Sequence, residues 1–460
     1  MDEFGMNQYP NRPQRRMRSN MQIIKEDYLP VIIIGIALIL IIWFIIGSIV
    51  RSVQRKQYNN DLNLQASAAA QENQAALEAE AVALLAEAAE LANQYDYNGA
   101  IAVLDQFSGD MYAFPNLSDK YAEYATAAAS LILWDDPSKV LNLSFHPLIA
   151  DTDRAFVNTD FYYDNYITVD EFSKILSQLY ANNYMLVRHS DIFGKDGKME
   201  LYLPKDKKPL IITETQVNYN TSLVDGDDDG IADKDGWGFA SKLILDDNGN
   251  LTCEMVNSAG NTVTGAYDIV PILESFIQTH QDFSYRGARA VLALTGFDGL
   301  FGYRTTPKAK AQFGTVYYDQ QVADAKKVIE AVKKCGYELA CYSYDNEPYG
   351  NYSADKIKED LELWKAEVTP LLGDLTLLVL CRNSDIADPG ISYSGDKYAV
   401  LKSYGFTNFI GFCTDGKPWF NAYADHTRMG RIMVTGNNLE AHPAWFAGIF
   451  DTEIIKDKAR

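Results

Sequence analysis

The chain has 460 residues and a formal net charge of −21 at pH 7, from 41 basic and 62 acidic side chains. This balance argues against nucleic acid as a main partner, because phosphate binding requires a basic surface. Hydrophobic residues make up 47% and charged residues 22% of the chain, which excludes a largely disordered protein. The five cysteines form no CxxC pair, so neither a zinc ribbon nor a dithiol redox motif is expected.

Residues 1–28 are rich in Asn, Gln, Pro and Arg and predict a disordered arm. Residues 29–50 carry no charge and are long enough to cross a bilayer core of about 30 Å. Basic residues follow this run where a signal peptide would have a cleavage site, so we interpret it as a retained transmembrane helix. The excess of basic residues before it favours a cytoplasmic arm and a single-pass type II protein of the cell membrane, with the bulk of the chain extracellular.

Residues 51–137 predict a helical stalk or hairpin. Residues 66–93 consist largely of Ala, Glu, Leu and Gln without Pro or Gly, which is a strong helix by propensity. Shorter helices are expected at residues 100–106 and 120–133. The segment is either a rigid spacer or one or two units similar to tetratricopeptide repeats, and a single pair of helices does not decide between them.

Residues 138–460 alternate short apolar runs with helical patterns, as in a chain of βα units. The apolar runs predict strands at residues 141–145, 184–189, 210–215, 290–295, 338–344, 376–381, 409–413 and 431–434. Helical periodicity lies between them, for example at residues 169–179 and 322–334. Seven or eight such units favour an α/β barrel over an open sheet.

Several short stretches of this region occur in the same order as in a known protein family. They lie at residues 145–151, 168–172, 209–212, 293–296 and 302–305. Together they make residues 140–460 similar to the polysaccharide deacetylase family, the NodB homology domain, in its membrane-anchored Gram-positive form. The resemblance implies a distorted (β/α)7 barrel that removes acetyl groups from N-acetylated glycans. It also implies a divalent metal held by one Asp and two His, which activates a water, and an Asp acting as general base.

The first catalytic motif of the family, Thr/Ser-Phe-Asp-Asp, aligns with residues 213–216 and has lost both carboxylates. Thr215 replaces the general base and Gln216 replaces the metal-binding Asp. Glu214 precedes the position of the general base by one residue. Because side chains alternate along a strand, its side chain lies on the opposite face.

The second motif, His-Ser/Thr-x-x-His, aligns with residues 342–346, so that Tyr342 and Asn346 replace both histidines. The third motif, Arg-Pro-Pro-Tyr/Phe-Gly, aligns with residues 381–386 and has lost its Pro and Gly. Amide and phenol oxygens are poor ligands for zinc or cobalt, so no zinc is expected.

One acidic segment predicts a different metal site. Its sequence fits the DxDxDG start of a calcium loop, although Gly236 stands where a bidentate Glu is expected. The predicted calcium ligands are Asp225, Asp227, Asp229 and Asp233. The alternative is a solvated acidic turn.

Aromatic residues are plentiful near the predicted barrel mouth and could stack on sugar rings. Tyr303, Arg304 and Trp419 lie in stretches that resemble retained family segments and are the predicted substrate-binding residues. Arg428 and Arg431 either touch a ligand or hold the barrel together through salt bridges. Of the five histidines, His146 follows a predicted strand and either faces the mouth or has a structural role.

The sequence therefore predicts a catalytically inactive pseudoenzyme that binds cell-wall glycan or scaffolds a protein partner. The competing hypothesis is an active carbohydrate esterase, an N-deacetylase of cell-wall polysaccharide. Its metal site would have to be rebuilt from Glu214, Asp345, Glu347 and the Asp-rich loop.

Overall fold

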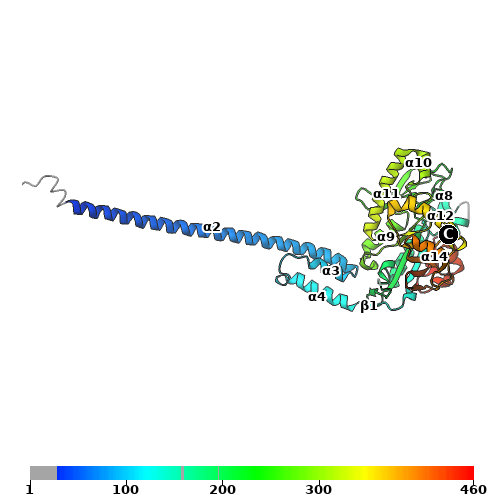
Figure 1. Cartoon of the computed structure of the whole chain (residues 1–460), viewed down its shortest axis with the longest axis horizontal. Coiled ribbons are helices and arrows are strands. Elements are labelled where there is room, and N and C mark those ends of the chain that lie inside the picture. The colour runs from blue at the N-terminus through cyan, green and yellow to red at the C-terminus, as the bar shows by residue number, and fades with distance from the viewer. Residues whose placement is uncertain (1–27, 157–159, 195) are drawn as a thin grey trace, which may run out of the picture. The chain divides into compact units, whose positions relative to one another are not determined.

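The structure, a computed structural model, describes residues 28–156, 160–194 and 196–460 (Figure 1). All but the last residue of the arm predicted at residues 1–28 lies outside these ranges. The chain divides into two compact units, residues 1–82 and 83–460, and helix α2 (Leu29–Asn93) has residues in both.

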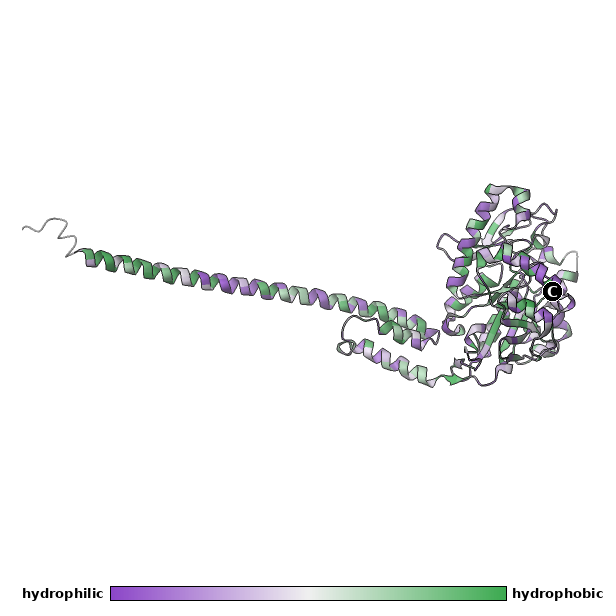
Figure 2. Ribbon diagram, viewed as in Figure 1, coloured by the Kyte–Doolittle hydropathy of each residue, from purple (hydrophilic) through white to green (hydrophobic). Residues whose placement is uncertain are grey.

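In the first unit, helix α2 begins beside Pro30, a residue favoured at the first turn of a helix. The helix then continues without interruption because no further proline occurs before its end. Its first turns are apolar and exposed, as the continuous green ribbon in Figure 2 shows, and Trp43 is 76% exposed. A window of 18 residues has a mean hydropathy of 3.2. The helix is therefore long and apolar enough to serve as a single-pass membrane anchor.

The second unit begins with the last turns of α2, which are followed by α3 (Tyr97–Leu104) and α4 (Pro115–Ser130). Both helices predicted in this segment are present with shifted ends. The Gln94 carbonyl accepts a hydrogen bond from the backbone N–H of Arg286 at 2.8 Å. Because of such bonds this helical hairpin belongs to the same compact unit as the barrel, and the boundary predicted after residue 137 does not separate them.

Seven parallel strands form a closed barrel, which confirms the predicted fold class. In spatial order each strand pairs with the next, and the last pairs with the first. The order is β12 (Asn408–Phe412), β11 (Leu377–Val379), β10 (Glu338–Cys341), β9 (Val291–Leu294), β5 (Lys208–Thr215), β2 (Leu141–Phe145) and β14 (Thr427–Met433). These strands are apolar on both faces because helices cover the outside and side chains fill the inside.

Of the eight predicted strands, the one at residues 184–189 is not part of the barrel. It forms β3 (Tyr184–Leu186), which pairs with β5 beside the barrel order. Strands β1 (Ile132–Leu133) and β4 (Tyr202–Leu203) pair with each other, and β13 (Phe420–Ala422) runs antiparallel to β14. An antiparallel sheet of β6 (Lys242–Leu245), β7 (Leu251–Val256) and β8 (Thr262–Gly265) was not predicted.

The longer helices cover the barrel and begin and end at recognisable caps. They are α7 (Val169–Ala181), α9 (Ile269–Thr279), α11 (Thr315–Cys335), α12 (Ala354–Leu363) and α14 (Gly395–Ser403). Thr168 and Glu171 form a capping box at the start of α7, and Gly336, with a φ of 103°, ends α11. The shorter helices are α5 (Thr152–Ala155), α6 (Asp160–Asn165), α8 (Thr221–Val224), α10 (Pro307–Phe313), α13 (Thr369–Leu372), α15 (Gly436–Ala441) and α16 (Thr452–Ile455).

Side chains of each barrel strand alternate between two buried clusters. Ile211, Val291 and Ala293 belong to the cluster inside the barrel, and their neighbours Leu210 and Leu292 belong to the cluster under the helices. On strand β5, Ile211 and every second residue after it, including Thr213 and Thr215, therefore point into the barrel.

Candidate functional site

A cavity of about 490 Å³ lies where the barrel strands end at their carboxyl termini, the face that carries active sites in barrels of this kind. We call it the mouth cavity. It is lined by His146, Asp164, Asn165, Gln216, Tyr342, Asn346, Arg382, Asn383, Phe412, Arg431, Met433, Thr435, Asn437 and Asn438.

All three positions that the family resemblance assigns to metal ligands line this cavity. Gln216 follows β5, and Tyr342 and Asn346 follow β10. Gln216 and Asn346 have positive φ angles of 61° and 53°. A left-handed conformation costs a non-glycine residue free energy and is concentrated at functional sites. The two loops therefore hold strained backbone at the cavity even though the expected ligand side chains are absent.

Thr215, which replaces the general base, lies behind the cavity wall, in contact with the lining residue His146. Its side chain is fully buried, and its hydroxyl donates to the carbonyl of Phe145 at 3.1 Å. The same oxygen lies 2.8 Å from Nδ1 of His146, so a neutral imidazole can donate to it. Burial lowers the pKa of His146 to about 4, and the positive charge of Arg431 adds to this effect. His146 therefore faces the mouth as a neutral ring that is hydrogen-bonded in place.

The donors in the mouth cavity do not fit the metal of the family. Gln216 and Asn346 offer amide oxygens, and burial raises the pKa of Tyr342 to about 12, which keeps its phenol protonated. A catalytic zinc site uses three imidazole, carboxylate or thiolate ligands. His146 is the one imidazole on the cavity wall and Asp164 the one carboxylate. Arg431, on the same wall, would repel a cation.

The acids considered for a rebuilt metal site lie elsewhere. Glu214 points away from the barrel interior, toward the cap of helix α9, where it interacts with Asp268. Asp345 and Glu347 follow β10 but do not line the mouth cavity. The backbone N–H of Asp345 donates to Asp360 at 3.0 Å, which turns this segment toward helix α12.

Arg431 is buried on β14 and is held by three backbone carbonyls. Its Nη1 donates to Ile410 at 3.1 Å and to Gly411 at 3.0 Å, and its Nη2 donates to Leu380 at 2.6 Å. Its guanidinium lies 4.2 Å from the ring centre of Phe412. In the described part of the chain it forms no ion pair, and its Nε has no hydrogen-bond partner. Of the two roles left open by the sequence, a position facing a ligand is the one this geometry favours.

Arg428 takes the other role. Its Nη2 lies 2.9 Å from a carboxylate oxygen of Asp385 in a buried ion pair. Its guanidinium also stacks on the rings of Tyr393, at 4.0 Å, and Trp419, at 5.3 Å. The hydroxyl of Tyr393 donates to the same carboxylate. Asp385, in the segment aligned with the third motif, thus holds β14 to the loop that follows β11.

A second hollow of about 550 Å³ adjoins the mouth cavity. The two share Asn383 and Phe412 as lining residues, and the second continues along an apolar segment that includes Ile386, Pro389 and Ile391. Together they form a groove whose one end is polar and cationic and whose other end combines apolar side chains with Asp385 and Asp388. Such a groove suits an extended ligand better than a single small molecule.

The three residues predicted to bind substrate do not line this groove. Tyr303 is 5% exposed and packs in the helix-side core. Arg304 donates to the carbonyls of Tyr219 and Asp298, each at 3.2 Å, and burial lowers its pKa. Trp419 donates from its indole N–H to the carbonyl of Phe412 at 3.1 Å, which places it behind the groove wall. The positions of Tyr303, Arg304 and Trp419 therefore do not support the prediction that they contact a ligand in the mouth cavity.

The predicted calcium loop lies beside a separate cavity of about 240 Å³ that Asp225 and Arg304 help to line. Oxygen atoms of Asp225, Asp227 and Asp229 lie within 4.8 Å of one another. In the described residues this is the one group of three or more His, Cys, Asp and Glu side chains close enough to share an ion. Asp233 stands outside the group and accepts a hydrogen bond from the N–H of Gly226 at 3.1 Å.

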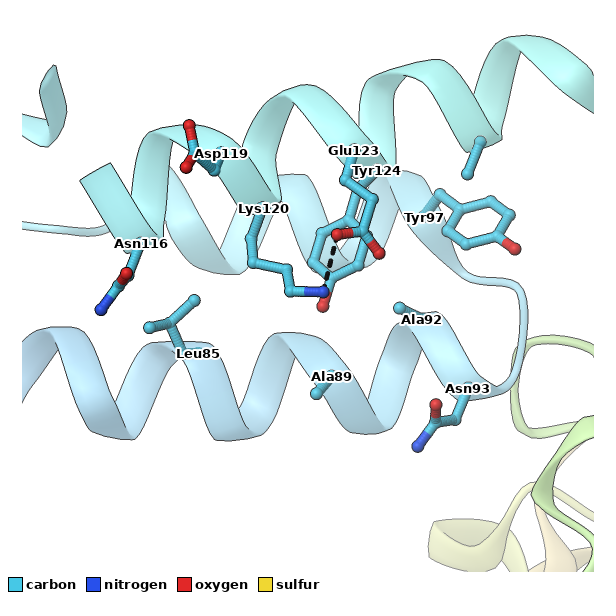
Figure 3. A pocket seen from close by; sticks show the side chains of 11 residues that line it. Leu85, Ala89, Ala92, Asn93, Tyr97, Asn116, Asp119, Lys120, Glu123 and Tyr124 are labelled. Atoms are coloured by element: carbon cyan, nitrogen blue, oxygen red, sulfur yellow. Dashed lines mark hydrogen bonds and ion pairs between the residues drawn. The ribbon is translucent and has the colours of Figure 1, made fainter. Parts of the chain in front are cut away.

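The helical hairpin contains a further cavity, of about 710 Å³, between the end of α2 and α4 (Figure 3). Lys120 and Glu123, both on α4, form an ion pair of 2.6 Å on its wall, and the ring of Tyr124 stacks on that of Tyr97 at 6.4 Å. Leu85 and Ala89 supply its apolar wall from α2. This cavity contains no group with evident catalytic chemistry.

Sequence reasoning missed the asparagines of the groove. Asn437 and Asn438 line the mouth cavity from α15, directly after β14. A signal was present, because an Asn-Asn pair at the carboxyl end of a predicted barrel strand is placed where ligand-binding residues of such barrels lie.

Comparisons with known proteins identify no family for this chain. No protein-family model matches the chain, and no curated protein matches it. Among solved structures, that of Streptococcus pyogenes deacetylase PplD in complex with acetate is similar with a TM-score of 0.37 and 13% identity. The match covers 65% of this chain and 94% of the other. The fold assignment rests on the pairing of the barrel strands and not on this similarity.

Proposed function

We propose that the protein is a membrane-anchored, deacetylase-like pseudoenzyme whose barrel mouth binds a cell-wall glycan. One observation carries the proposal. The positions that the resemblance assigns to metal ligands, Gln216, Tyr342 and Asn346, share one cavity and offer no imidazole or carboxylate. Without a metal-bound water and a carboxylate base, the deacetylase mechanism has no nucleophile.

Binding in place of catalysis is supported by the lining of the groove. Asn165, Asn383, Asn437 and Asn438 present amides beside Gln216, and side chains of this kind donate to and accept from sugar hydroxyls. The continuation of the groove past Phe412 gives space for a chain of sugars rather than one ring. A scaffolding role toward a protein partner is the other form of the proposal, and the experiment below separates the two.

In this proposal the N-terminal apolar helix tethers the barrel to a membrane. In the proposed topology the arm is cytoplasmic, α2 spans the cell membrane in type II orientation, and the barrel is extracellular. The acidic loop at Asp225 binds calcium in this proposal, since three carboxylates within reach of one ion suit a hard cation. Calcium at millimolar concentration is available outside cells to a site of modest affinity.

The test uses the full chain in detergent micelles. Sedimentation with purified cell-wall sacculi should retain the protein, and a long incubation with N-acetylglucosamine oligomers should release no acetate. Phe412→Ala should weaken retention, whereas Tyr112→Ala, at a hairpin residue that is 87% exposed, should not. Retention by a membrane protein fraction but not by sacculi would favour the scaffold. Acetate release that is abolished by a chelator would overturn the proposal in favour of the esterase.

A further inference from the structure

The buried positive charge of Arg431 in the mouth cavity restricts the class of ligand more than the shape of the cavity does. Arg431 is 1% exposed and lies on the wall of the mouth cavity. A buried charge is costly unless a partner compensates it, so buried guanidinium groups are normally paired with acids. In the described part of the chain, Arg428 and Arg460, whose side chains are each 1% exposed, form ion pairs with Asp385 and Glu171. Arg304, which is buried and held by carbonyls, has the charges of Asp298 and Asp225 nearby.

No carboxylate compensates Arg431. The groups that interact with it electrostatically are Tyr342, Cys381 and Cys413. Burial raises the pKa of each of these groups to about 12, so all three are neutral at physiological pH. The one carboxylate on the cavity wall, Asp164, is exposed to solvent.

The guanidinium is also fixed in place with donor capacity left over. Its contacts to the carbonyls of Leu380, Ile410 and Gly411 hold the plane of the group, and Nε is buried without a partner. A guanidinium held in this way loses little side-chain entropy when an oxyanion binds, and its N–H groups match the geometry of carboxylate and phosphate. Arg382 adds a second positive charge at the rim of the same cavity.

From this geometry we infer that the mouth cavity is a receptor for an oxyanion, a carboxylate or a phosphate, carried on a polyhydroxylated chain. Arg431 binds the oxyanion, and the neighbouring amides of Gln216, Asn346 and Asn438 bind hydroxyl groups of the chain. The inference rests on the proposed glycan binding and specifies the charge of the ligand. It implies that the cavity has changed from a cation site into an anion site.

The experiment compares probes of similar length with the full chain in detergent micelles. A hyaluronan tetrasaccharide carries carboxylates, a glycerol phosphate oligomer carries phosphates, and an N-acetylglucosamine tetrasaccharide is neutral. Isothermal titration should give a dissociation constant at least tenfold lower for one of the acidic probes than for the neutral one. Whichever acidic probe binds more tightly identifies the source of the oxyanion. Equal affinity for all three probes would overturn the inference and leave glycan binding intact, whereas absence of binding to any probe would overturn both.

Two variants locate the site. Arg431→Gln removes the charge, and Asn346→Asp places a negative charge in the cavity with almost no change of shape. Each should weaken binding of the preferred acidic probe at least tenfold and change binding of the neutral probe less than twofold. Asn248→Asp makes the same charge change in the exposed turn after β6 and should have no effect on either probe. If Arg431→Gln does not fold, Asn346→Asp decides alone, and an unchanged preference for the acidic probe in that variant contradicts the inference.

Discussion

The carboxyl groups of Glu214 and Asp268 share a buried space between strand β5 and the start of helix α9. Burial raises the pKa of Glu214 well above its usual value, and the charge of Asp268 raises it further. One oxygen of Asp268 accepts hydrogen bonds from the N–H groups of Leu148, at 3.0 Å, and Ile269, at 2.9 Å, which favour its ionised form. Glu214 is therefore the partner that keeps its proton, beside the charge of Asp268.

This pair makes stability depend on pH in a definite direction. Above pH 4.5 the unfolded chain releases the Glu214 proton while the folded chain keeps it, so the free energy of unfolding falls as pH rises toward the folded pKa. Glu214→Gln places a neutral amide of nearly the same shape beside Asp268, without a titrating proton. The variant should melt at a higher temperature than the parent at pH 8, with the difference decreasing to zero near pH 4. Each pH unit between the two pKa values is worth about 1.4 kcal/mol.

Asp268→Asn serves as the matched control, because its amide would donate to Glu214 and stabilise the ionised carboxylate instead. The melting temperature of this variant should vary less with pH than that of the parent. A loss of stability in Glu214→Gln that is the same at every pH from 4 to 8 would show that the two carboxyls share no proton.

The ion pair of Arg428 and Asp385 gives a second stability prediction. Asp385→Ala leaves a buried guanidinium without its carboxylate, so the free energy of unfolding should fall by about 3–5 kcal/mol. The exposed pair of Lys417 and Asp415, at 3.4 Å, provides the comparison, and Asp415→Ala should have little effect. Chemical denaturation of both variants measures the difference. Equal effects would mean that Asp385 is not holding β14 to the third-motif loop.

Most of the barrel could be predicted from the sequence because its strands are apolar on both faces and stand between helical patterns. Every predicted strand is present, but several end earlier than predicted. The strand predicted at residues 338–344 ends at Cys341, because Ser343 takes a positive φ of 61°. The sheet of β6, β7 and β8 was missed, although residues 246–250 and 257–261 contain Asn and Gly at two hairpin turns.

The site was only partly predictable. Parallel strands bring their carboxyl ends to one face, and for this reason the positions of Gln216, Tyr342 and Asn346 meet as alignment to a barrel family predicts. The roles of Arg428 and Arg431 could not be separated, because the two residues lie on the same strand and differ only in whether an acid lies opposite. That difference arises from the loop carrying Asp385, whose path depends on tertiary packing.

Calcium should stabilise the protein if the aspartates of the acidic loop share an ion. The free energy of unfolding should then rise with the logarithm of calcium concentration, by about 2.7 kcal/mol at a hundredfold excess over the dissociation constant. The melting temperature of the full chain in detergent, measured from micromolar to millimolar calcium, tests this. Asp227→Ala should abolish the shift, and Asp247→Ala, in the turn between β6 and β7, should preserve it. Melting curves that do not respond to calcium would show the loop to be a plain acidic turn.

The proposed topology predicts which part of the chain an external protease can reach. Protease added to intact cells should digest the chain beyond about residue 57, where the apolar run has ended, and leave a small membrane-protected fragment. Epitope tags at the two termini make the result readable, since only the C-terminal tag should disappear. Survival of the C-terminal tag until the cells are lysed would place the barrel in the cytoplasm.

The last prediction concerns the lost chemistry of the mouth cavity. Thr215→Asp, Gln216→Asp, Tyr342→His and Asn346→His together restore the residue types of the family at positions that the structure places in or beside one cavity. The quadruple variant should bind one zinc or cobalt ion with an affinity at least a hundredfold above that of the parent, measured by metal analysis after dialysis. Imidazole and carboxylate ligands replace the amide and phenol side chains in this variant, and the new carboxylate charges offset the charge of Arg431.

Acetate release need not follow, because a set of catalytic groups that acts as a unit loses nearly all of its activity when one member is misplaced. A variant that folds but binds no metal would show that these four positions are not the ligand set. Stoichiometric zinc in the unmodified protein, together with acetate release, would show that the barrel is an enzyme.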